Sequence, residues 1–289
     1  MTSARRRLVR LVGFVCLCLG CGRVIDLGTD IVWSTDFESD GLSALSLTPG
    51  TGGAFRVAGN PTIATSTEHA HSGVTAVKIT SAGTNTFPAP YAPGGAALYK
   101  VGEFPSEGYY SAWYFVPRAV PAAVNWNIVR FGYPGGADAG TPLLPVGSAG
   151  RLPVDGGVDA AAQTPGAPSF AELFDVRLRY QPSGATTLVL FDHRPAYREE
   201  SMPSPVPVVP IGRWFQLELF YRNAGDGSGH LSIWLEGTLV YDVARPMNTS
   251  PTIYFSVGSL IEDGTPAELF IDDVAISRTR VTPNGVLKL

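Results

Sequence analysis

The sequence of 289 residues predicts an all-β fold, a β-sandwich or jelly roll, and two observations support this prediction. First, apolar and polar residues alternate with a period of two in many short runs, and after residue 20 no stretch keeps an apolar period of 3.6 residues for three turns. Second, 33 Gly and 24 Pro separate runs that are rich in β-branched and aromatic residues. Many short strands without helices are typical of sandwiches and jelly rolls.

Each predicted strand is a short alternating or β-branched run bounded by turn-forming residues. These strands cover residues 31–37, 53–58, 74–80, 97–101, 109–116, 127–131, 173–180, 186–192, 214–222, 230–235, 238–243, 252–257 and 268–277. Between two of them, Glu236 and Gly237 predict a tight hairpin turn. The sandwich therefore extends over residues 31–279, followed by a C-terminal tail at 280–289.

Residues 134–169 interrupt this pattern. The segment is rich in Gly, Ala and Pro, and it contains no aromatic residue. It is too long for an ordinary connection, so it is either a functional loop or a disordered insertion. The small and chemically inert side chains favour the insertion.

The N-terminus has the features of a secretory signal at residues 1–20. Four arginines precede a short apolar run at 11–20, which is too short to span a bilayer as a helix. The following stretch, Cys18-Leu19-Gly20-Cys21, resembles a bacterial lipobox, although Cys18 stands where that motif usually has Leu. The resemblance implies lipidation of Cys21, a tether at 21–30, and an exported protein anchored in the bacterial outer membrane or periplasm. An ordinary signal peptide is the alternative.

Cysteine content and charge exclude several classes of function. All three cysteines lie within the first 21 residues, which leaves no disulfide framework, redox pair, cysteine zinc site or cysteine nucleophile in the sandwich. The net charge is −4, and loss of the signal with its four arginines leaves 17 Lys and Arg against 25 Asp and Glu. Nucleic-acid binding is not expected at this balance, because phosphate contacts need clustered basic residues.

Five motifs follow one another along the chain in an order that resembles a known family. They are TDFESDG at 35–41, HSGVTAV at 71–77, GRWFQLE at 212–218, GHLSIWLEG at 229–237 and LFIDDV at 269–274. Together they resemble the concanavalin A-like lectin and glucanase jelly rolls, in particular the branch with polysaccharide lyases and lyase-like binding domains. The resemblance implies two stacked antiparallel sheets with a glycan on the concave face of one. It covers most of residues 31–279 apart from the insertion.

A polysaccharide face is predicted from side chains that alternation places together. Arg177 and Arg179 share a face of one strand with Asp175, and the strands at 214–222 and 230–235 each present a mixed polar and aromatic face. Aromatic rings stack on pyranose rings, while bidentate polar groups hold hydroxyls or a uronate carboxylate. The predicted carbohydrate-binding set is Tyr110, Tyr114, Arg177, Arg179, Trp214, Gln216, Glu218, His230 and Trp234. The alternative is a solvated sheet face with incidental charges.

For the predicted strands at 109–116 and 127–131, the pattern must be used to decide which side chains point to the core and which to the groove. In the strand at 109–116 both faces are aromatic, and we expect Trp113 and Phe115 in the core, with Tyr110 and Tyr114 in the groove. In the strand at 127–131, alternation places Asn127 and Arg130 on opposite faces.

Catalysis is an open alternative to binding. The resemblance implies, for a lyase, His230 or Tyr114 as the base, and Arg177 or Arg179 with Gln216 to neutralise the uronate. The Tyr- and Lys-rich strand that lyases carry near the C-terminus is missing here. A glycosidase needs two facing carboxylates, for which Glu218 and Asp175 are the candidates.

A structural calcium ion is the one cofactor expected. Asp36 and Glu38 lie at the end of the first predicted strand, and Asp272 and Asp273 lie in the last, two strands that pair in related jelly rolls. Carboxylate oxygens suit Ca²⁺. The alternative is that the aspartates simply end a strand near solvent.

These observations lead to three hypotheses. The first is an exported lipoprotein whose jelly roll binds polysaccharide without cleaving it. The second is a polysaccharide lyase that acts on a uronate-containing glycan, and the third is a structural or adhesion protein of the cell envelope.

Overall fold

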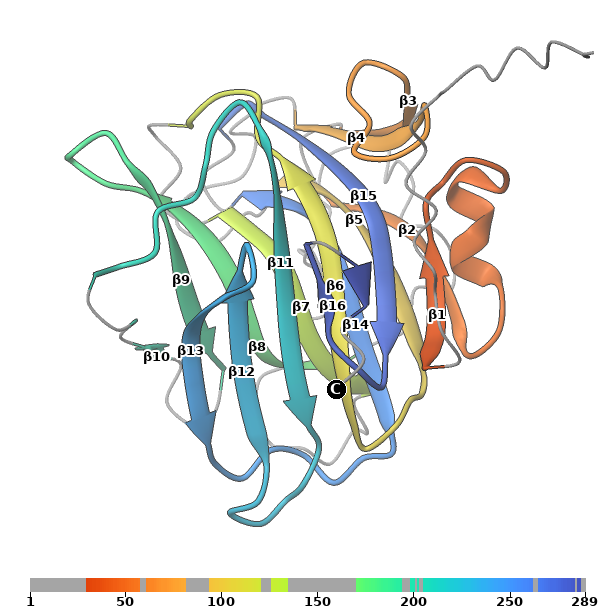
Figure 1. Cartoon of the computed structure of the whole chain (residues 1–289), viewed down its shortest axis with the longest axis vertical. Helices are drawn as coiled ribbons and strands as arrows, with labels where there is room; N and C mark the ends of the chain where they lie inside the picture. The colour runs from red at the N-terminus through yellow and green to blue at the C-terminus, as the bar shows by residue number, and fades with distance from the viewer. Residues whose placement is uncertain are drawn as a thin grey trace, which may run out of the picture.

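The computed structural model describes residues 30–57, 61–81, 94–120, 126–134, 170–193, 198–200, 202, 205–261, 265–283 and 285–286. Two antiparallel sheets pack face to face as a sandwich (Figure 1), so the predicted all-β class is confirmed. No helix in the described residues is long and apolar enough to cross a membrane. The signal, the lipidation motif and most of the insertion lie outside the described residues.

One sheet has eight strands and faces the viewer in Figure 1. Its order is β13 (Thr238–Ala244), β12 (His230–Leu235), β11 (Trp214–Arg222), β6 (Glu107–Phe115), β15 (Ala267–Ser277), β4 (Ala76–Ser81) and β3 (Thr62–Ser66), with β1 (Ile31–Thr35) paired to β15. The long strand β15 has two partners along one edge. Its first half pairs with β4 and its second half with β1.

The second sheet has seven strands and lies behind the first. Its order is β10 (Arg198–Glu200), β9 (Thr186–Asp192), β8 (Phe170–Tyr180), β7 (Trp126–Pro134), β14 (Thr252–Ile261), β5 (Gly94–Glu103) and β2 (Thr51–Val57). Smaller elements are the 3-10 helix η1 (Gly41–Ser46) and the pair β16 (Val281–Thr282) with β17 (Gly285–Val286). The sequence pattern did not predict β3, β10 or these smaller elements, because they are short and have little hydrophobic periodicity.

The predicted hairpin turn is present between β12 and β13. Glu236 and Gly237 both have positive φ, at 52° and 75°. Two consecutive residues of this kind match the twist of the flanking antiparallel strands, which is why such turns select Gly at the second position.

Aromatic rings from both sheets form the centre of the core. The ring of Phe131 in the seven-stranded sheet lies 4.7 Å from Tyr110 and 5.3 Å from Tyr221, both of the eight-stranded sheet. Within its own sheet Phe131 stacks on Phe174 at 4.9 Å. These contacts bury the inner faces of β6, β7, β8 and β11 against one another.

The choice of face for β6 was wrong. Tyr110 and Tyr114 point into the core and are 0% exposed, whereas Trp113 and Phe115 lie on the outer face of the sheet. The reason is that the outer face is itself covered: the ring of His71 stacks on Trp113 at 3.6 Å and that of His69 on Phe115 at 4.2 Å. Aromatic content alone therefore did not distinguish the inner from the outer face.

The core position of Tyr114 predicts the effect of removing its hydroxyl. That oxygen is buried and has no hydrogen-bond partner among the described residues, and burial raises the pKa of Tyr114 far above its ordinary value. Tyr114→Phe should raise the free energy of unfolding by about 1 kcal/mol, because it removes an unsatisfied polar group and keeps the ring. Chemical denaturation measures the difference, and Tyr109→Phe on the outer face is the control, with no gain expected. A loss of stability in Tyr114→Phe would contradict this placement.

Candidate functional site

Buried charged side chains gather on the outer face of the seven-stranded sheet. In the ladder between β7 and β8, Arg130 lies opposite Asp175 and Asn127 opposite Arg177. Residues directly opposite each other in an antiparallel pair point to the same face. All four are at most 8% exposed and none belongs to the hydrophobic core between the sheets. Charged groups this deeply buried are rare unless they are paired or used.

A β-bulge in β7 brings Asn127 and Arg130 to one face. The register against β8 shifts between Asn127 and Val129, so one extra residue is inserted and the alternation restarts. The neighbouring Ile128 and Val129 both point to the core. The expectation that Asn127 and Arg130 lie on opposite faces was therefore wrong, because strict alternation does not hold across a bulge.

The centre of this face is the carboxylate of Asp175, which is 0% exposed. Arg177 binds it with two guanidinium nitrogens, Nε to one oxygen and Nη2 to the other, the second bond at 2.8 Å. The Nε2 atom of His193 lies 2.8 Å from the same Oδ2. The guanidinium carbon of Arg177 lies 4.1 Å from the ring centroid of Phe191, a cation–π contact that fixes its plane.

The electrostatics keep Asp175 ionised. Burial alone would raise the pKa of Asp175, but the hydrogen bonds from His193 and Arg177 and the charge of Arg177 outweigh it, and the pKa lies below its ordinary value. A buried carboxylate with a bidentate Arg and a His is a rigid arrangement, since each group restricts the rotamers of the others.

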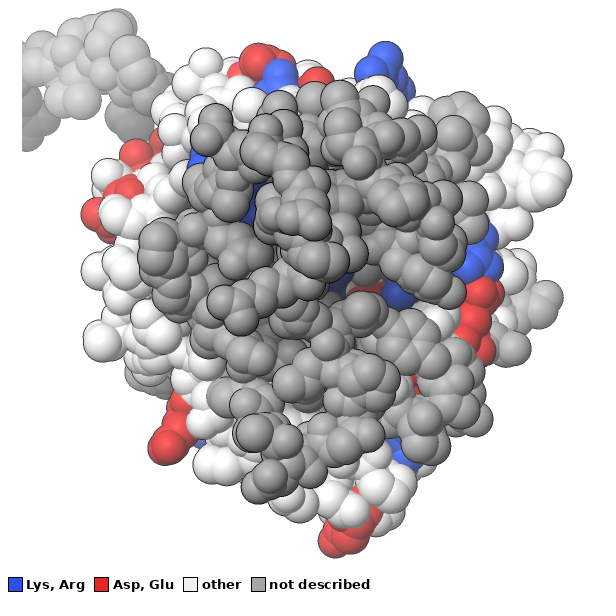
Figure 2. All heavy atoms as spheres, turned by 180° about the vertical axis from the view of Figure 1, so that it is seen from behind, with Lys and Arg blue, Asp and Glu red and all other residues white. Residues whose placement is uncertain are grey.

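More exposed polar groups surround this centre. Arg179 lies one step along β8, 27% exposed, with Nη1 2.7 Å from Glu199 of β10. The Oδ1 atom of Asn127 is buried without a hydrogen-bond partner among the described residues. Figure 2 views the molecule from this side and shows basic and acidic atoms next to each other near the centre of the face. Such a set can bind hydroxyls and carboxylates of a ligand.

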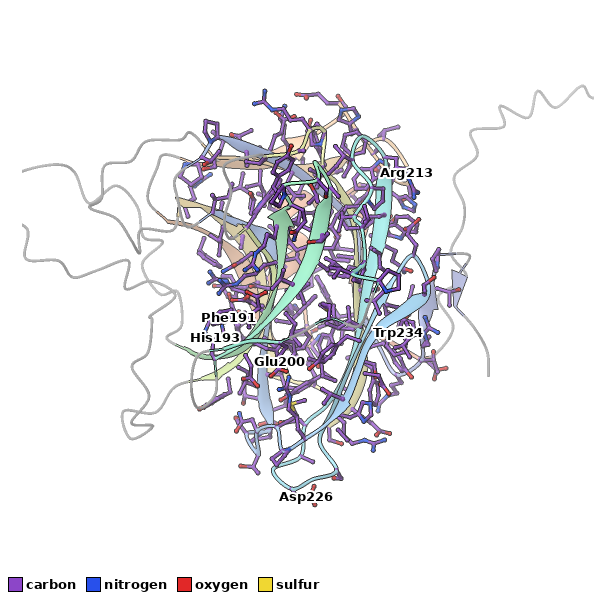
Figure 3. The ribbon with its side chains drawn as sticks, turned by 90° about the vertical axis from the view of Figure 1, so that its left-hand side faces the viewer. Phe191, His193, Glu200, Arg213, Asp226 and Trp234 are labelled. Atoms are coloured by element: carbon purple, nitrogen blue, oxygen red, sulfur yellow. The ribbon has the colours of Figure 1, made fainter. Side chains whose placement is uncertain are left out.

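The predicted carbohydrate-binding residues do not form one surface. Arg177 and Arg179 lie on the seven-stranded sheet, whereas five others lie on the outer face of the eight-stranded sheet, and Tyr110 and Tyr114 lie between the sheets. Figure 3 shows Phe191 and His193 on one side of the sandwich and Trp234 on the other. The five on the eight-stranded sheet are Trp214, Gln216, Glu218, His230 and Trp234. The prediction that these residues line a single groove was wrong, because β8 and β11 belong to different sheets.

The same division affects the catalytic candidates. Of the residues that the lyase hypothesis assigned, Tyr114 is in the core, while Arg177 and His230 are on opposite sides of the sandwich. Asp175 and Glu218 point away from each other across both sheets, so they cannot act as the facing carboxylates of a glycosidase.

Gln216 and Glu218 hold a segment of the chain instead. The segment at 278–283 follows β15 and crosses the outer face of the eight-stranded sheet. Glu218 accepts hydrogen bonds from the backbone of Val281 and from Arg280 Nε, the latter at 2.9 Å, and Gln216 donates to the carbonyl of Val281. Burial raises the pKa of Glu218, and these bonds oppose that effect.

The acidic residues expected to bind calcium fix the loop before β4. Glu38 Oε1 accepts bonds from the backbone of Val74 and Thr75, and Asp272 Oδ2 accepts from the backbone of His71. Asp273, with an unusual φ of 45°, binds the ring of His71 at 2.6 Å, and Asp36 binds the backbone of Glu38.

These bonds direct N–H donors at the oxygens that would coordinate a cation. In the described part of the chain, no group of three or more His, Cys, Asp or Glu residues is arranged to hold a metal ion. Calcium binding at Asp36, Glu38, Asp272 and Asp273 stays a prediction, which calorimetric titration of Ca²⁺ into the wild type and Asp272→Asn would test.

Comparison with solved structures places this fold among known jelly rolls. An endo-β-1,4-glucuronan lyase from the fungus Trichoderma reesei superposes with a TM-score of 0.53 at 14% identity, covering 78% of this chain and 91% of the lyase. The cellulose-induced protein Cip1 superposes with a TM-score of 0.52 at 17% identity, covering 86% of this chain and 98% of Cip1. No protein-family model matches the sequence, and a search of curated proteins found no match. At these identities the likeness shows the fold, the expected two-sheet jelly roll.

Sequence reasoning missed His193 and Phe191. His193 is isolated in the sequence and directly follows β9, and its partner Asp175 is 18 residues away. The available signal was the hairpin of β8 and β9: once Arg177 and Asp175 were placed on one face, a short connection brings the end of β9 beside the start of β8.

The Asp175 cluster predicts a pH-dependent loss of stability. Asp175→Asn should lower the free energy of unfolding at pH 7 by about 3 kcal/mol, because it leaves Arg177 and His193 without their shared carboxylate. Since the folded pKa of Asp175 lies below the ordinary 3.8, its contribution is complete above that pH and is lost as the pH falls through the folded pKa. The difference between wild type and variant should therefore shrink below pH 4 in urea denaturation. Glu199→Gln, an exposed pair with Arg179, is the control and should change little.

Proposed function

We propose that this chain recognises an acidic polysaccharide on the outer face of its seven-stranded sheet. The observation that carries the proposal is the grouping of Arg130, Arg177 and Arg179 on two adjacent strands, with Asp175 and Glu199 as the facing carboxylates. These guanidinium groups share one face of the sheet on a protein that is acidic overall. A ligand with its own carboxylates would form charge-assisted hydrogen bonds with them.

Rigid positioning supports recognition of planar anionic groups. The Asp175 carboxylate and the Phe191 ring fix the Arg177 guanidinium from two sides. Arginine forks bind carboxylates with two parallel hydrogen bonds, and a fork held in place beforehand loses less entropy on binding. The fold also agrees with this, since one solved structure of similar fold is named as a glucuronan lyase.

A second candidate function is lyase chemistry on the same face. The favouring observation is the contact of His193 with Asp175, which orients the imidazole beside Arg177. Abstraction of a proton next to a uronate carboxylate needs a base of this kind and a group that neutralises the acid, and Asn127 and Arg130 on the same face are the candidates for that group. The base takes the proton from the carbon next to the carboxylate, and the electron pair of that C–H bond forms a C=C double bond as the neighbouring glycosidic C–O bond breaks. The leaving oxygen takes up a proton from the protonated base or from water, and the new chain end is an unsaturated uronate.

Affinity electrophoresis tests the binding proposal. In gels that contain polyglucuronate or alginate, the wild type should be retarded, and Arg179→Ala should weaken this by about tenfold through the loss of one charge-assisted contact. Arg213→Ala is a matched control, because Arg213 is also an exposed arginine paired to a glutamate but lies at the end of the other sheet. Unretarded migration of the wild type in every acidic gel would contradict the proposal and favour a structural or adhesion role.

The same proteins separate binding from catalysis. The ultraviolet absorbance of unsaturated uronate should rise if the chain is a lyase, and His193→Ala should abolish the rise while retaining retardation. Retardation without any absorbance change would exclude the lyase candidate and leave the non-catalytic module.

We also propose export and lipid anchoring through Cys21, based on the arginine-rich start and the Cys18–Cys21 motif. In a bacterial host, the wild type should partition into the detergent phase with the mass of an acylated N-terminus. Cys21→Ala should abolish acylation, whereas Cys16→Ala within the apolar run should not. An unacylated wild type would refute the anchor.

A further inference from the structure

A group of aromatic side chains lies on the outer face of the eight-stranded sheet, on the opposite side of the sandwich from Arg177 and Arg179, and could bind a ligand. On the outer face of the eight-stranded sheet, Phe220 of β11 lies opposite Tyr109 of β6, with ring centroids 5.0 Å apart. The ring of Trp234 from β12 is 6.1 Å from Tyr109, and that of His230 is 6.0 Å from Phe220. We name these four residues the aromatic platform. All four are partly exposed.

Other side chains of the protein cover part of this sheet face. Trp113 and Phe115 are stacked under His71 and His69 of the loop before β4, and Arg280 lies 4.3 Å over the ring of Trp234. Tyr109 and Phe220 are partly exposed, with the guanidinium of Arg222 5.7 Å from the ring centroid of Phe220. Large aromatic side chains left partly in water on a sheet surface are typical of a binding site.

The charges around the platform disfavour an anionic ligand. Arg222 is 2.8 Å from Glu107, and Arg280, which lies 4.3 Å over the ring of Trp234, is 2.9 Å from Glu218. Both cations are therefore already neutralised, while Asp242 adds a further carboxylate. An anionic glycan finds no excess positive charge among these groups.

The polar groups beside the rings suit hydroxyls. His230 Nε2 lies 2.7 Å from Asp242 Oδ1, and Ser232 donates to the same oxygen. Asp242 is 52% exposed, so its second oxygen can accept from a ligand hydroxyl. The rings of Phe220 and Trp234 are inclined to that of Tyr109 by 49° and 42°. The platform is thus twisted, which suits a single twisted sugar chain rather than a flat surface.

We propose that the aromatic platform binds a neutral pyranose polysaccharide, as a second site independent of the acidic-glycan face. Sugar rings stack on Tyr109 and Phe220, next to Trp234 with its Arg280 cover, and Asp242 with His230 binds their hydroxyls. The inference rests on this face alone and does not depend on the proposed function of the other sheet.

Affinity electrophoresis with hydroxyethyl cellulose, galactomannan and polyglucuronate tests the proposal on the full chain. At least one neutral polymer should retard the wild type. Phe220→Ala and Tyr109→Ala should each weaken that retardation by about tenfold, the usual loss when one central ring leaves a binding surface. Thermal unfolding of each variant verifies that it is folded.

Two controls separate the two faces. Leu47→Ala removes an exposed apolar side chain beside β5 of the other sheet and should leave neutral binding unchanged. Arg179→Ala should do the same, while Phe220→Ala should leave polyglucuronate binding unchanged. Neutral retardation that survives both ring substitutions, or no retardation by any neutral polymer, would overturn the platform. Wild-type dimerisation in sedimentation that Phe220→Ala abolishes would overturn it in favour of self-association.

Discussion

The aromatic contact between the two sheets is the interaction on which the remaining architecture depends. Tyr110 and Tyr221 from one sheet meet Phe131 from the other, and Phe255 lies 5.3 Å from Phe131 within its own sheet. Because these rings fill the interior, they fix which way each strand faces. Every side chain that alternates with them is then directed outwards, onto one of two separate surfaces.

Buried polar groups have different hydrogen-bond partners on the two outer surfaces. On the seven-stranded sheet, Asp175 balances Arg177 and His193, so charge is buried in a paired cluster. On the eight-stranded sheet, Glu218 accepts hydrogen bonds from the backbone of Val281 and the side chain of Arg280. Here the buried carboxylate holds a later segment of the chain against the sheet. The first arrangement groups arginines on two adjacent strands, whereas in the second Arg222 and Arg280 are each paired with a glutamate. This difference is the physical basis for proposing different ligands for the two surfaces.

The sequence was sufficient for the fold class and for most strands, because period-two alternation and turn residues are local signals. It was also sufficient for the hairpin at Glu236 and Gly237, where two positive φ angles have a residue preference. It was not sufficient for the faces of β6, since His69 and His71 cover Trp113 and Phe115 from a distant loop. Nor could it reveal the bulge after Asn127, which changes the face of Arg130 without any sequence marker.

The assembly of the candidate site depended on which strands share a sheet. Arg177 and Trp234 both alternate correctly within their strands, yet β8 and β12 belong to different layers. Jelly-roll connections pass between sheets, so strands that follow one another in the chain are often not neighbours. His193 became part of the site only through that topology, together with the pairing of β8 and β9.

The pairing of β1 with β15 has a mechanical consequence. In a chain held by lipid at Cys21, any tension between the membrane and a bound polymer enters the domain at Ile31, which pairs with Ser277 at the end of β15. Since β15 is also hydrogen-bonded to β6 and β4, the load spreads at once into the middle of the eight-stranded sheet. The segment that begins at Arg278, whose backbone N–H donates to Asp30, lies at the same point of entry. Force on the anchor would therefore load first the hydrogen bonds between the strands that carry the aromatic platform. The buried Asp175 cluster, in the opposite sheet, would be loaded last.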